Sequence, residues 1–263
     1  MRGRHRAVVA VALVALVALV ALVAMLAEVK VRSRLPWREL ADDWRRFGYG
    51  RSSVLLVANA GMRGLAACTG HVDRAIYRDD AAIERLAPGA DQLRRRWMDV
   101  RREALAVRLA RGRDVHGIFD LAERWDVALL KPHGGDYTEL ARRSMPVTCR
   151  ALADMGVEMA ILSRLAPGAR LPTHIGPAYS FLRYHLCLEG DGRAELVVDG
   201  ERYRWREGEH VVFDETRPHS ATNDSPAARL VLFADVLRPI GVRGLDSLVR
   251  ATARATAAWH GWR

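Results

Sequence analysis

The sequence predicts a mainly β domain with flanking helices, preceded by one N-terminal transmembrane helix. The β prediction comes from the second half of the chain. There, after Gly156, the helical spacing of apolar residues gives way to alternation, with turn residues about every 8–12 positions. The membrane prediction comes from an uninterrupted apolar run near the N-terminus. Because short strands punctuated by turns are typical of double-layered or closed β folds, we expect a sandwich or barrel.

The apolar run covers residues 7–27 and follows a basic tail, residues 1–6. At about 1.5 Å per residue, this stretch just crosses about 30 Å of hydrocarbon. A cleaved signal peptide is the alternative, but its apolar core is usually about 7–15 residues long and ends in an A-x-A pattern. Since neither condition is met cleanly, the sequence favours a transmembrane anchor, with the lipid bilayer as a partner.

Basic residues on the two flanks of the apolar run indicate its orientation. The N-terminal flank has Arg2, Arg4 and Arg6, whereas the C-terminal flank has Lys30, Arg32, Arg34, Arg38, Arg45 and Arg46. The excess on the C-terminal side predicts a single-pass membrane protein whose larger part lies in the cytoplasm.

Residues 28–117 are predicted to form a juxtamembrane and helical region. Apolar residues recur at helical spacing over residues 91–111, which predicts one amphipathic helix. Residues 112–150 are rich in Gly and Pro and indicate loops. A further helix is expected over residues 146–155, because proline is well tolerated at the first helical position.

The remaining elements are short strands and a final helix. Asp199-Gly200 predicts a tight hairpin, since both residues tolerate a positive φ angle. The tail, residues 240–263, has the pattern of a basic amphipathic helix, which we expect to pack on the domain rather than lie on a membrane. The expected strands are near residues 157–165, 180–188, 193–198, 201–206, 209–214 and 229–236.

Composition argues against nucleic-acid binding and against a disulfide framework. The formal charge is +10, but residues 1–34 alone contribute +5, and no basic stripe with interleaved aromatic residues follows. The chain has three cysteines, Cys68, Cys149 and Cys187, and no CxxC motif. Three cysteines in 263 residues predict reduced thiols, and whether Cys149 and Cys187 meet is left open.

Two of the expected strands carry charged or polar residues at informative positions. In the strand over residues 181–188, alternation places Arg183, His185 and Cys187 on one face, opposite a leucine-rich face. That polar face is either part of a site or the wet side of an edge strand. Arg229 opens the otherwise apolar strand 229–236, and a lone arginine there indicates a bound anion or a carboxylate partner.

His174 and His219 are the candidate metal ligands. Imidazole suits Fe(II), and the common oxygenase site combines two histidines with one carboxylate. The carboxylate normally lies two residues after the first histidine, where this chain has Gly176. The sequence therefore requires a site of two histidines with water at the third position. Asp214 and Glu215 are alternative sources of the carboxylate, although we favour a role in the turn for both.

At these positions the chain resembles the aspartyl/asparaginyl β-hydroxylase family of Fe(II)- and 2-oxoglutarate-dependent dioxygenases, over about residues 118–239. The resemblance implies a double-stranded β-helix core, also described as jelly-roll or cupin-like. It implies that His174 and His219 bind iron without a carboxylate, and that Ser163, Arg183, His185 and Arg229 contact 2-oxoglutarate. The motifs are PTHIGP at 172–177, LRYHL at 182–186, FDE at 213–215 ahead of His219, and FADV at 233–236 after Arg229.

The chemistry implied by this resemblance is hydroxylation of an unactivated C–H bond, using Fe(II), 2-oxoglutarate as cosubstrate and O2. The catalytic residues would be His174, His219 and Arg229. Family members hydroxylate the β-carbon of Asp or Asn in polypeptides, or a fatty acyl chain of a membrane lipid. Both acceptor classes are compatible with this sequence.

A cupin-like metal-binding module or isomerase without oxygenase activity is the alternative. His219-x-x-x-Asn223 after Gly208 echoes the second cupin motif, whereas His174-Ile175-Gly176 fails the first, which needs HxH. Three tryptophans, Trp97, Trp125 and Trp205, are interpreted as core residues rather than as a substrate platform.

Overall fold

The computed structural model describes residues 49–111, 124–174, 176 and 178–259. The predicted membrane segment, residues 7–27, lies outside these ranges. No helix within them is both long and apolar enough to cross a membrane. The chain divides into two compact units. The smaller includes helix α3 and Tyr179, and the larger comprises the segments 73–176 and 180–263.

In the smaller unit, α3 spans Tyr49–Cys68. The backbone N–H of His71 donates to the Ala66 carbonyl, and Gly70 has a φ angle of 81°. A glycine in this left-handed conformation is a common way to end a helix. The Asn59 side chain is buried and accepts a hydrogen bond from the backbone N–H of Tyr179 at 2.7 Å.

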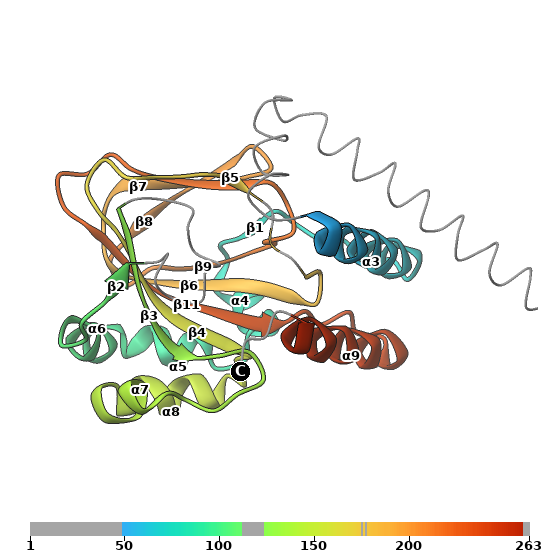
Figure 1. The fold of residues 1–263 in the computed structure, drawn as a ribbon, viewed down its shortest axis with the longest axis horizontal. Helices are drawn as coiled ribbons and strands as arrows, with labels where there is room; N and C mark the ends of the chain where they lie inside the picture. The colour runs from blue at the N-terminus through green and yellow to red at the C-terminus, as the bar shows by residue number, and fades with distance from the viewer. Residues whose placement is uncertain (1–48, 112–123, 175, 177, 260–263) are drawn as a thin grey trace, which may run out of the picture. The chain divides into compact units, whose positions relative to one another are not determined.

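The larger unit contains two antiparallel sheets. The seven-stranded sheet has the order β1-β9-β6-β11-β4-β3-β2, and the four-stranded sheet has the order β5-β10-β7-β8. In chain order the strands are β1 (Ile76–Tyr77), β2 (Ala110–Arg111), β3 (Trp125–Lys131), β4 (Met159–Leu165), β5 (Arg170–His174), β6 (Phe181–Glu189), β7 (Asp191–Val198), β8 (Glu201–Arg206), β9 (His210–Phe213), β10 (His219–Asn223) and β11 (Arg229–Leu237). Strands β4 to β11 are shared between two facing sheets, which is the arrangement of a jelly roll (Figure 1).

Helices cover the outer face of the seven-stranded sheet (Figure 1). They are α4 (Asp80–Leu86), α5 (Ala90–Arg95), α6 (Trp97–Leu105), α7 (Glu139–Ser144) and α8 (Pro146–Asp154). Their apolar residues pack on Leu182, Tyr184 and Leu186 of β6 in one buried cluster. The last helix, α9 (Arg243–Trp259), buries Val249 and Ala253. The structure therefore agrees with a mainly β domain flanked by helices.

A second buried cluster lies on the other face of the same sheet. It includes Cys187, Phe213 and Phe233, together with Leu196 and Trp205 from the four-stranded sheet. Because β6 has β9 and β11 as neighbours, it is an internal strand with both faces covered. The interpretation of its Arg183 face as the solvent-exposed side of an edge strand is thus wrong. That face points into the space between the two sheets.

The six predicted strands are confirmed, with ends that shift by a few residues. The hairpin is also confirmed, because Asp199 and Gly200 have φ angles of 49° and 86° and Val198 pairs with Glu201. The predicted helices over 146–155 and at the C-terminus correspond to α8 and α9.

The prediction of one helix over residues 91–111 is wrong. The chain forms α5 and α6 with a break at Arg96, and then the short strand β2. At the break, Arg96 has φ −98° and ψ 14°, outside the helical region, and its N–H bonds to the Leu93 carbonyl. Strand β2 pairs with β3, a long-range contact that the periodicity of a single segment does not reveal.

Candidate active site

The two candidate metal ligands lie side by side on neighbouring strands. His174 ends β5 and His219 begins β10, and the two residues pair directly in the antiparallel register. Their ring centroids are 4.1 Å apart. His174 Nδ1 lies 2.8 Å from the Pro172 carbonyl, and His219 Nδ1 lies 2.9 Å from the Arg217 carbonyl. A carbonyl only accepts, so each Nδ1 carries the hydrogen and each Nε2 keeps a lone pair for a metal ion.

Burial keeps both imidazoles neutral. It lowers the pKa of His174 to about 4 and the pKa of His219 well below its usual value. The positive charge of Arg183 lowers both further. Since a metal ion binds the deprotonated nitrogen, these histidines do not have to release a proton at neutral pH before they coordinate.

Gly176 occupies the position where the common oxygenase site has a carboxylate. A Cβ atom at this residue would lie 2.4 Å from Cδ of Glu215, closer than real contacts allow. The backbone N–H of Gly176 also donates to the Glu215 carbonyl at 2.7 Å. The Glu215 carboxyl group therefore fills the space beside the histidine strand that a side chain at 176 would need. A carboxyl group is present there after all, supplied by another segment of the chain.

The Glu215 carboxyl group belongs to a buried charged network around Arg183. Arg183 forms ion pairs with Glu215 and with Asp235, its Nε lying 3.0 Å from Asp235 Oδ1. Burial raises the pKa of Glu215 to about 8. Burial also opposes ionisation of Asp235, but Arg183 and a hydrogen bond from His133 outweigh it and lower the Asp235 pKa. The Arg183 guanidinium thus pairs with two carboxyl groups, and the pKa of Glu215 is raised while that of Asp235 is lowered.

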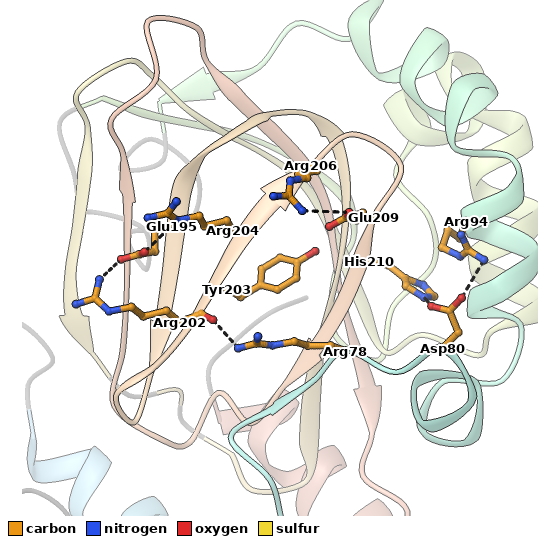
Figure 2. Close-up of a pocket in the computed structure, with 10 residues that line it drawn as sticks. All are labelled: Arg78, Asp80, Arg94, Glu195, Arg202, Tyr203, Arg204, Arg206, Glu209 and His210. Atoms are coloured by element: carbon orange, nitrogen blue, oxygen red, sulfur yellow. Dashed lines mark hydrogen bonds and ion pairs between the residues drawn. The ribbon is translucent and has the colours of Figure 1, made fainter.

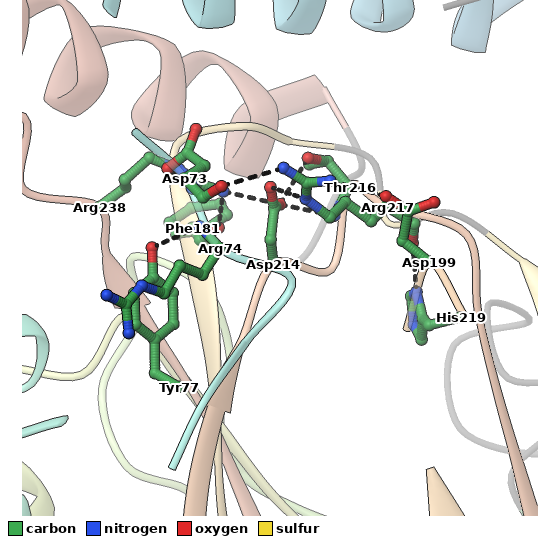
Figure 3. Close-up of polar contacts among 10 residues, drawn as sticks. All are labelled: Asp73, Arg74, Tyr77, Phe181, Asp199, Asp214, Thr216, Arg217, His219 and Arg238. Carbon is green, nitrogen blue, oxygen red and sulfur yellow. Dashed lines mark hydrogen bonds and ion pairs between the residues drawn. The ribbon is translucent and has the colours of Figure 1, made fainter. Parts of the chain in front are cut away.

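Asp214, the other candidate carboxylate, has a structural role. It pairs with the buried Arg238 at 2.7 Å and with Arg217 at 3.4 Å, and it accepts hydrogen bonds from Thr216 (Figure 3). These contacts fix the turn that precedes β10. They also hold the Arg217 carbonyl that orients the His219 ring. The prediction of a turn role is confirmed for Asp214.

Arg229 is a buried cation that lies against an aromatic ring and has no counterion among the residues that the structure describes. Its side chain is 2% exposed, and no carboxylate among the described residues lies within ion-pair distance. The guanidinium carbon lies 4.6 Å from the centre of the Trp205 ring. Burial lowers its pKa to about 10. An unpaired buried guanidinium is costly, so this one is suited to a bound anion.

Ser163 lies beside Arg229 and is held by a tryptophan. Arg229 Nη2 donates to Ser163 Oγ at 3.4 Å, and the indole N–H of Trp125 donates to the same oxygen at 2.8 Å. Because Oγ accepts both bonds, its own hydrogen remains available to a further acceptor. Ser163 and Arg229 can therefore donate together to one carboxylate.

Aromatic contacts connect the histidine pair with Arg229. The His219 ring meets Phe213 at 5.5 Å, and Phe213 meets the buried ring of His185 at 5.1 Å. His185 then stacks on Trp205 at 5.9 Å, and Trp205 lies under Arg229. Burial lowers the pKa of His185 well below its usual value. The rings of Phe213, His185 and Trp205 thus form a continuous row from the histidine pair to Arg229.

The structure places four of the six predicted site residues in two pairs. His174 and His219 form one pair, and Ser163 and Arg229 form the other. His185 lies between the two pairs. Arg183 is the exception, because carboxyl groups of the protein already surround it. The six residues are His174, His219, Ser163, Arg183, His185 and Arg229.

Two residues of the site were interpreted from the sequence as core. Trp125 and Trp205 are indeed buried, but they also hold Ser163 and support Arg229. A tryptophan in an apolar strand carries no sign of which polar residue it will meet. All three cysteines are free thiols, so Cys149 and Cys187 are not paired.

Asp80, Asp91 and His210 form a separate group of potential metal ligands. Their ligand atoms lie within 4.8 Å of one another. Arg94 pairs with both carboxylates, with Nη2 at 3.1 Å from Asp80 and 3.4 Å from Asp91. Since Arg94 pairs with both carboxylates and Arg95 also pairs with Asp91, protein cations already balance their charge, and the cluster is a weaker candidate for iron than the neutral histidine pair.

The fold and the site define the class: a jelly-roll protein with two buried imidazoles on adjacent strands and a buried arginine further along the same interior. The profile of the family described as Aspartyl/Asparaginyl beta-hydroxylase matches residues 94–239, more than half of the chain. The chain belongs to this family. All six site residues fall inside the matched segment.

Curated relatives carry hydroxylase names. The chain is 33% identical over 121 residues to an ornithine lipid ester-linked acyl 2-hydroxylase from Rhizobium tropici, covering 44% of this chain and 43% of that protein. It is 36% identical over 83 residues to aspartate beta-hydroxylase domain-containing protein 2 from Xenopus tropicalis, covering 30% of this chain and 22% of that protein. The matched part spans less than half the length of these relatives.

Among solved structures, a protein of the 2OG-Fe(II) oxygenase family from Burkholderia pseudomallei is similar to this chain with a TM-score of 0.40 and 12% identity. The match covers 57% of this chain and 88% of that one. A cupin domain of Cnp3 from Schizosaccharomyces pombe matches with a TM-score of 0.34 and 13% identity, covering 51% of this chain and 71% of that one. At these scores no residue-by-residue correspondence follows.

Proposed function

We propose that this protein is an Fe(II)- and 2-oxoglutarate-dependent dioxygenase that hydroxylates an unactivated C–H bond. One observation carries the proposal: two neutral imidazoles, each with a free Nε2, share one interior with a buried arginine that has no carboxylate partner within the described part of the chain. A pair of histidine ligands alone is compatible with many kinds of metalloenzyme. The additional anion site favours a metal centre that works with an anionic cosubstrate.

The donor set fits iron. His174 and His219 would hold Fe(II) through Nε2, and imidazole is a suitable ligand for that ion. Glu215 lies next to Gly176, where the common site has its carboxylate. With 2-oxoglutarate and O2, the bound iron supplies the oxidising chemistry, and the cosubstrate is converted to succinate and CO2.

The residues of the chain bind and orient the cosubstrate. Arg229 and Ser163 would bind the far carboxylate, the first through its charge and the second through its hydroxyl hydrogen. His185 would lie along the remainder of the molecule, and Arg183 would act there while it stays paired with Glu215 and Asp235. The aromatic residues around His185 exclude water, which keeps the reactive end away from solvent.

A fatty acyl chain of a membrane lipid is the acceptor we favour. The support is the likeness to the relative named as a lipid acyl 2-hydroxylase, which extends over more residues than the likeness to the aspartate beta-hydroxylase domain-containing protein. The apolar residues 7–27, as a single-pass anchor, would keep the domain at the cytoplasmic surface of a bilayer. Asp or Asn in a polypeptide is the other acceptor, and nucleic acid is not a proposed partner.

Succinate production tests the function and the acceptor together. The full chain in detergent receives Fe(II), ascorbate and 2-oxoglutarate, with either membrane lipid or peptides containing Asp and Asn. Stimulation by lipid supports acyl-chain hydroxylation. Stimulation by peptide alone would instead support hydroxylation of Asp or Asn in a polypeptide. If neither stimulates and the protein binds no iron, a cupin-like protein without oxygenase activity becomes the better description.

A further inference from the structure

A cavity in the larger unit is lined by charged residues and lies apart from the candidate active site. Its volume is about 600 Å³. Its wall comes from strands β7 and β8, the first residue of β9 and the residue before it, helices α4 and α5, and Arg78 (Figure 2). None of the six candidate site residues lines it. Cavities of about 300–1,000 Å³ commonly bind small molecules.

Arginines dominate the lining of this cavity. Five of them face three carboxylates, and His210 counts as neutral because burial lowers its pKa. The formal charge of the lining is therefore +2. The charged residues are Arg78, Arg94, Arg202, Arg204 and Arg206, with Asp80, Glu195 and Glu209.

The positive charge is not neutralised locally. Glu195 is shared by two arginines, Arg202 and Arg204. Arg78 donates from Nη2 to the Arg202 carbonyl on the open edge of β8, and no carboxylate among the described residues pairs with it. Arg206 is only loosely paired, with Nη1 3.9 Å from Glu209. Guanidinium groups with donors to spare therefore surround the cavity.

A buried hydroxyl without a partner also lines the cavity. The Tyr203 side chain is 7% exposed, and its hydroxyl has no hydrogen-bond partner among the described residues. In Figure 2 its ring lies between the arginines of β8 and the imidazole of His210. Burial raises the pKa of Tyr203, so the hydroxyl remains protonated and can donate. A buried donor without an acceptor is costly and indicates a place for a ligand.

We propose that this cavity binds the phosphate group of a phosphate ester, with Arg78 and Arg204 as its main cationic contacts and the Tyr203 hydroxyl as a neutral donor. The planar guanidinium fork matches the spacing of phosphate oxygens, and several such forks suit a group of multiple charge. The tyrosine ring offers an apolar surface to the organic part of the ester. Lipid headgroups and soluble metabolites both carry such a group.

The carboxylates of the cavity favour a compact ligand over a nucleic acid. Glu195 and Glu209 lie among the arginines and would repel the neighbouring phosphates of a continuous backbone. A single phosphate group can instead approach the unpaired Arg78. The site therefore fits one phosphate group rather than a chain of them.

Calorimetric titration of the full chain in detergent tests the proposal with three probes. These are inorganic phosphate, sn-glycerol 3-phosphate and a short-chain phosphatidic acid. Saturable binding of the glycerol phosphate indicates a soluble ester, and binding of the phosphatidic acid alone indicates a lipid headgroup. Either result supports a phosphate-ester site.

Variants show whether binding occurs in this cavity. Arg78→Gln and Arg204→Gln should each weaken binding about tenfold, because each removes a charge-assisted contact. Tyr203→Phe keeps the ring and should weaken binding about 3–10-fold. Arg143→Gln is the matched control, because it removes the same charge from α7, where the side chain is 79% exposed and outside the cavity.

Three outcomes would overturn the proposal. The first is that no phosphate probe binds saturably, and the second is that Arg143→Gln weakens binding as much as Arg204→Gln. The third is that only an oligonucleotide binds. Thermal unfolding of each variant shows that it is folded, and Arg204 is 65% exposed, so its replacement leaves the core intact.

Discussion

The two sheets of the larger unit differ in what they contribute to the candidate site. The seven-stranded sheet supplies Ser163, Arg183, His185 and Arg229, from strands that are buried on both faces. The four-stranded sheet supplies the two imidazoles from the ends of two five-residue strands, β5 and β10. The candidate anion site is thus built into a sheet covered on both faces, and the candidate metal ligands lie at the ends of two short strands of the other sheet.

This difference has a physical basis. A charge such as Arg229 needs exclusion of water to bind an anion strongly, and that exclusion is best in a layer covered by helices on one side and a sheet on the other. Imidazoles need an open side, where a substrate and oxygen can approach the metal. We therefore expect substitutions on the two sheets to have different effects.

The largest effect should come from the four-stranded sheet. His219→Ala leaves one imidazole for the metal ion, so we expect succinate production to fall below detection and stoichiometric Fe(II) binding to disappear. Metal analysis and turnover of the purified variant measure both. His71→Gln, a histidine in the smaller unit, should leave both unchanged. Iron binding with normal turnover in His219→Ala would exclude it as a ligand.

On the seven-stranded sheet, Arg229→Ala should raise the KM for 2-oxoglutarate while Fe(II) binding persists. Losing one partner of a buried charged pair costs about 2–5 kcal/mol, or roughly 30- to 5,000-fold in affinity. Steady-state kinetics over a range of 2-oxoglutarate concentrations measures it. Arg164→Ala is the control, since that arginine lies on β4 with its side chain 45% exposed. An unchanged KM would remove Arg229 from the site.

The contact between the segment after β5 and the turn before β10 can be tested at Gly176. An aspartate there would complete the common ligand set on paper, but its Cβ would collide with the Glu215 carboxyl group. We expect Gly176→Asp to destabilise the fold by about 1–3 kcal/mol, as overpacking does, and to bring no gain in turnover. Thermal unfolding and succinate production measure the two effects.

The double variant Gly176→Asp with Glu215→Gly removes the collision and should recover the melting temperature. If the single variant is as stable as the parent protein, Glu215 does not occupy that space. This pair of variants separates a steric requirement for glycine from a chemical one.

The sequence missed strands in both sheets. The expectation of loops over residues 112–150 is wrong for β3, residues 125–131, and for α7, and no strand was predicted at β5 or β10. Strands β4, β6 and β11 have long apolar runs, whereas β5 reads RLPTH and β10 reads HSATN. Those short segments have weak strand signals, because they contain few β-branched or aromatic residues and β5 includes a proline. Both histidines were predicted to be metal ligands, which stays a prediction, and the strands that carry them were not predicted.

Contacts between distant segments were the other part that the sequence did not predict. The Glu215 carboxyl group beside Gly176 and the indole of Trp125 on Ser163 depend on the register of several strands. Local periodicity contains no information about such pairs. The resemblance supplied residue roles at individual positions, and the structure supplied the neighbours that hold them.

The smallest effect should come from replacing Trp125, which donates a hydrogen bond to Ser163 in the candidate anion site. Trp125→Phe keeps a ring in the core but removes the N–H that donates to Ser163. A lost hydrogen bond of this kind costs about 0.5–1.5 kcal/mol, so the KM for 2-oxoglutarate should rise about 2–12-fold. Trp97→Phe, on α6, should leave that KM unchanged.

A double-mutant cycle shows whether the tryptophan acts through the serine. If Trp125 only orients the Ser163 hydroxyl, then Ser163→Ala and the double variant should have the same KM for 2-oxoglutarate. Additive effects would mean that the indole contributes to the anion site by another route. Either way the change should be confined to cosubstrate binding, because the proposed Fe(II) ligands, His174 and His219, belong to the other sheet.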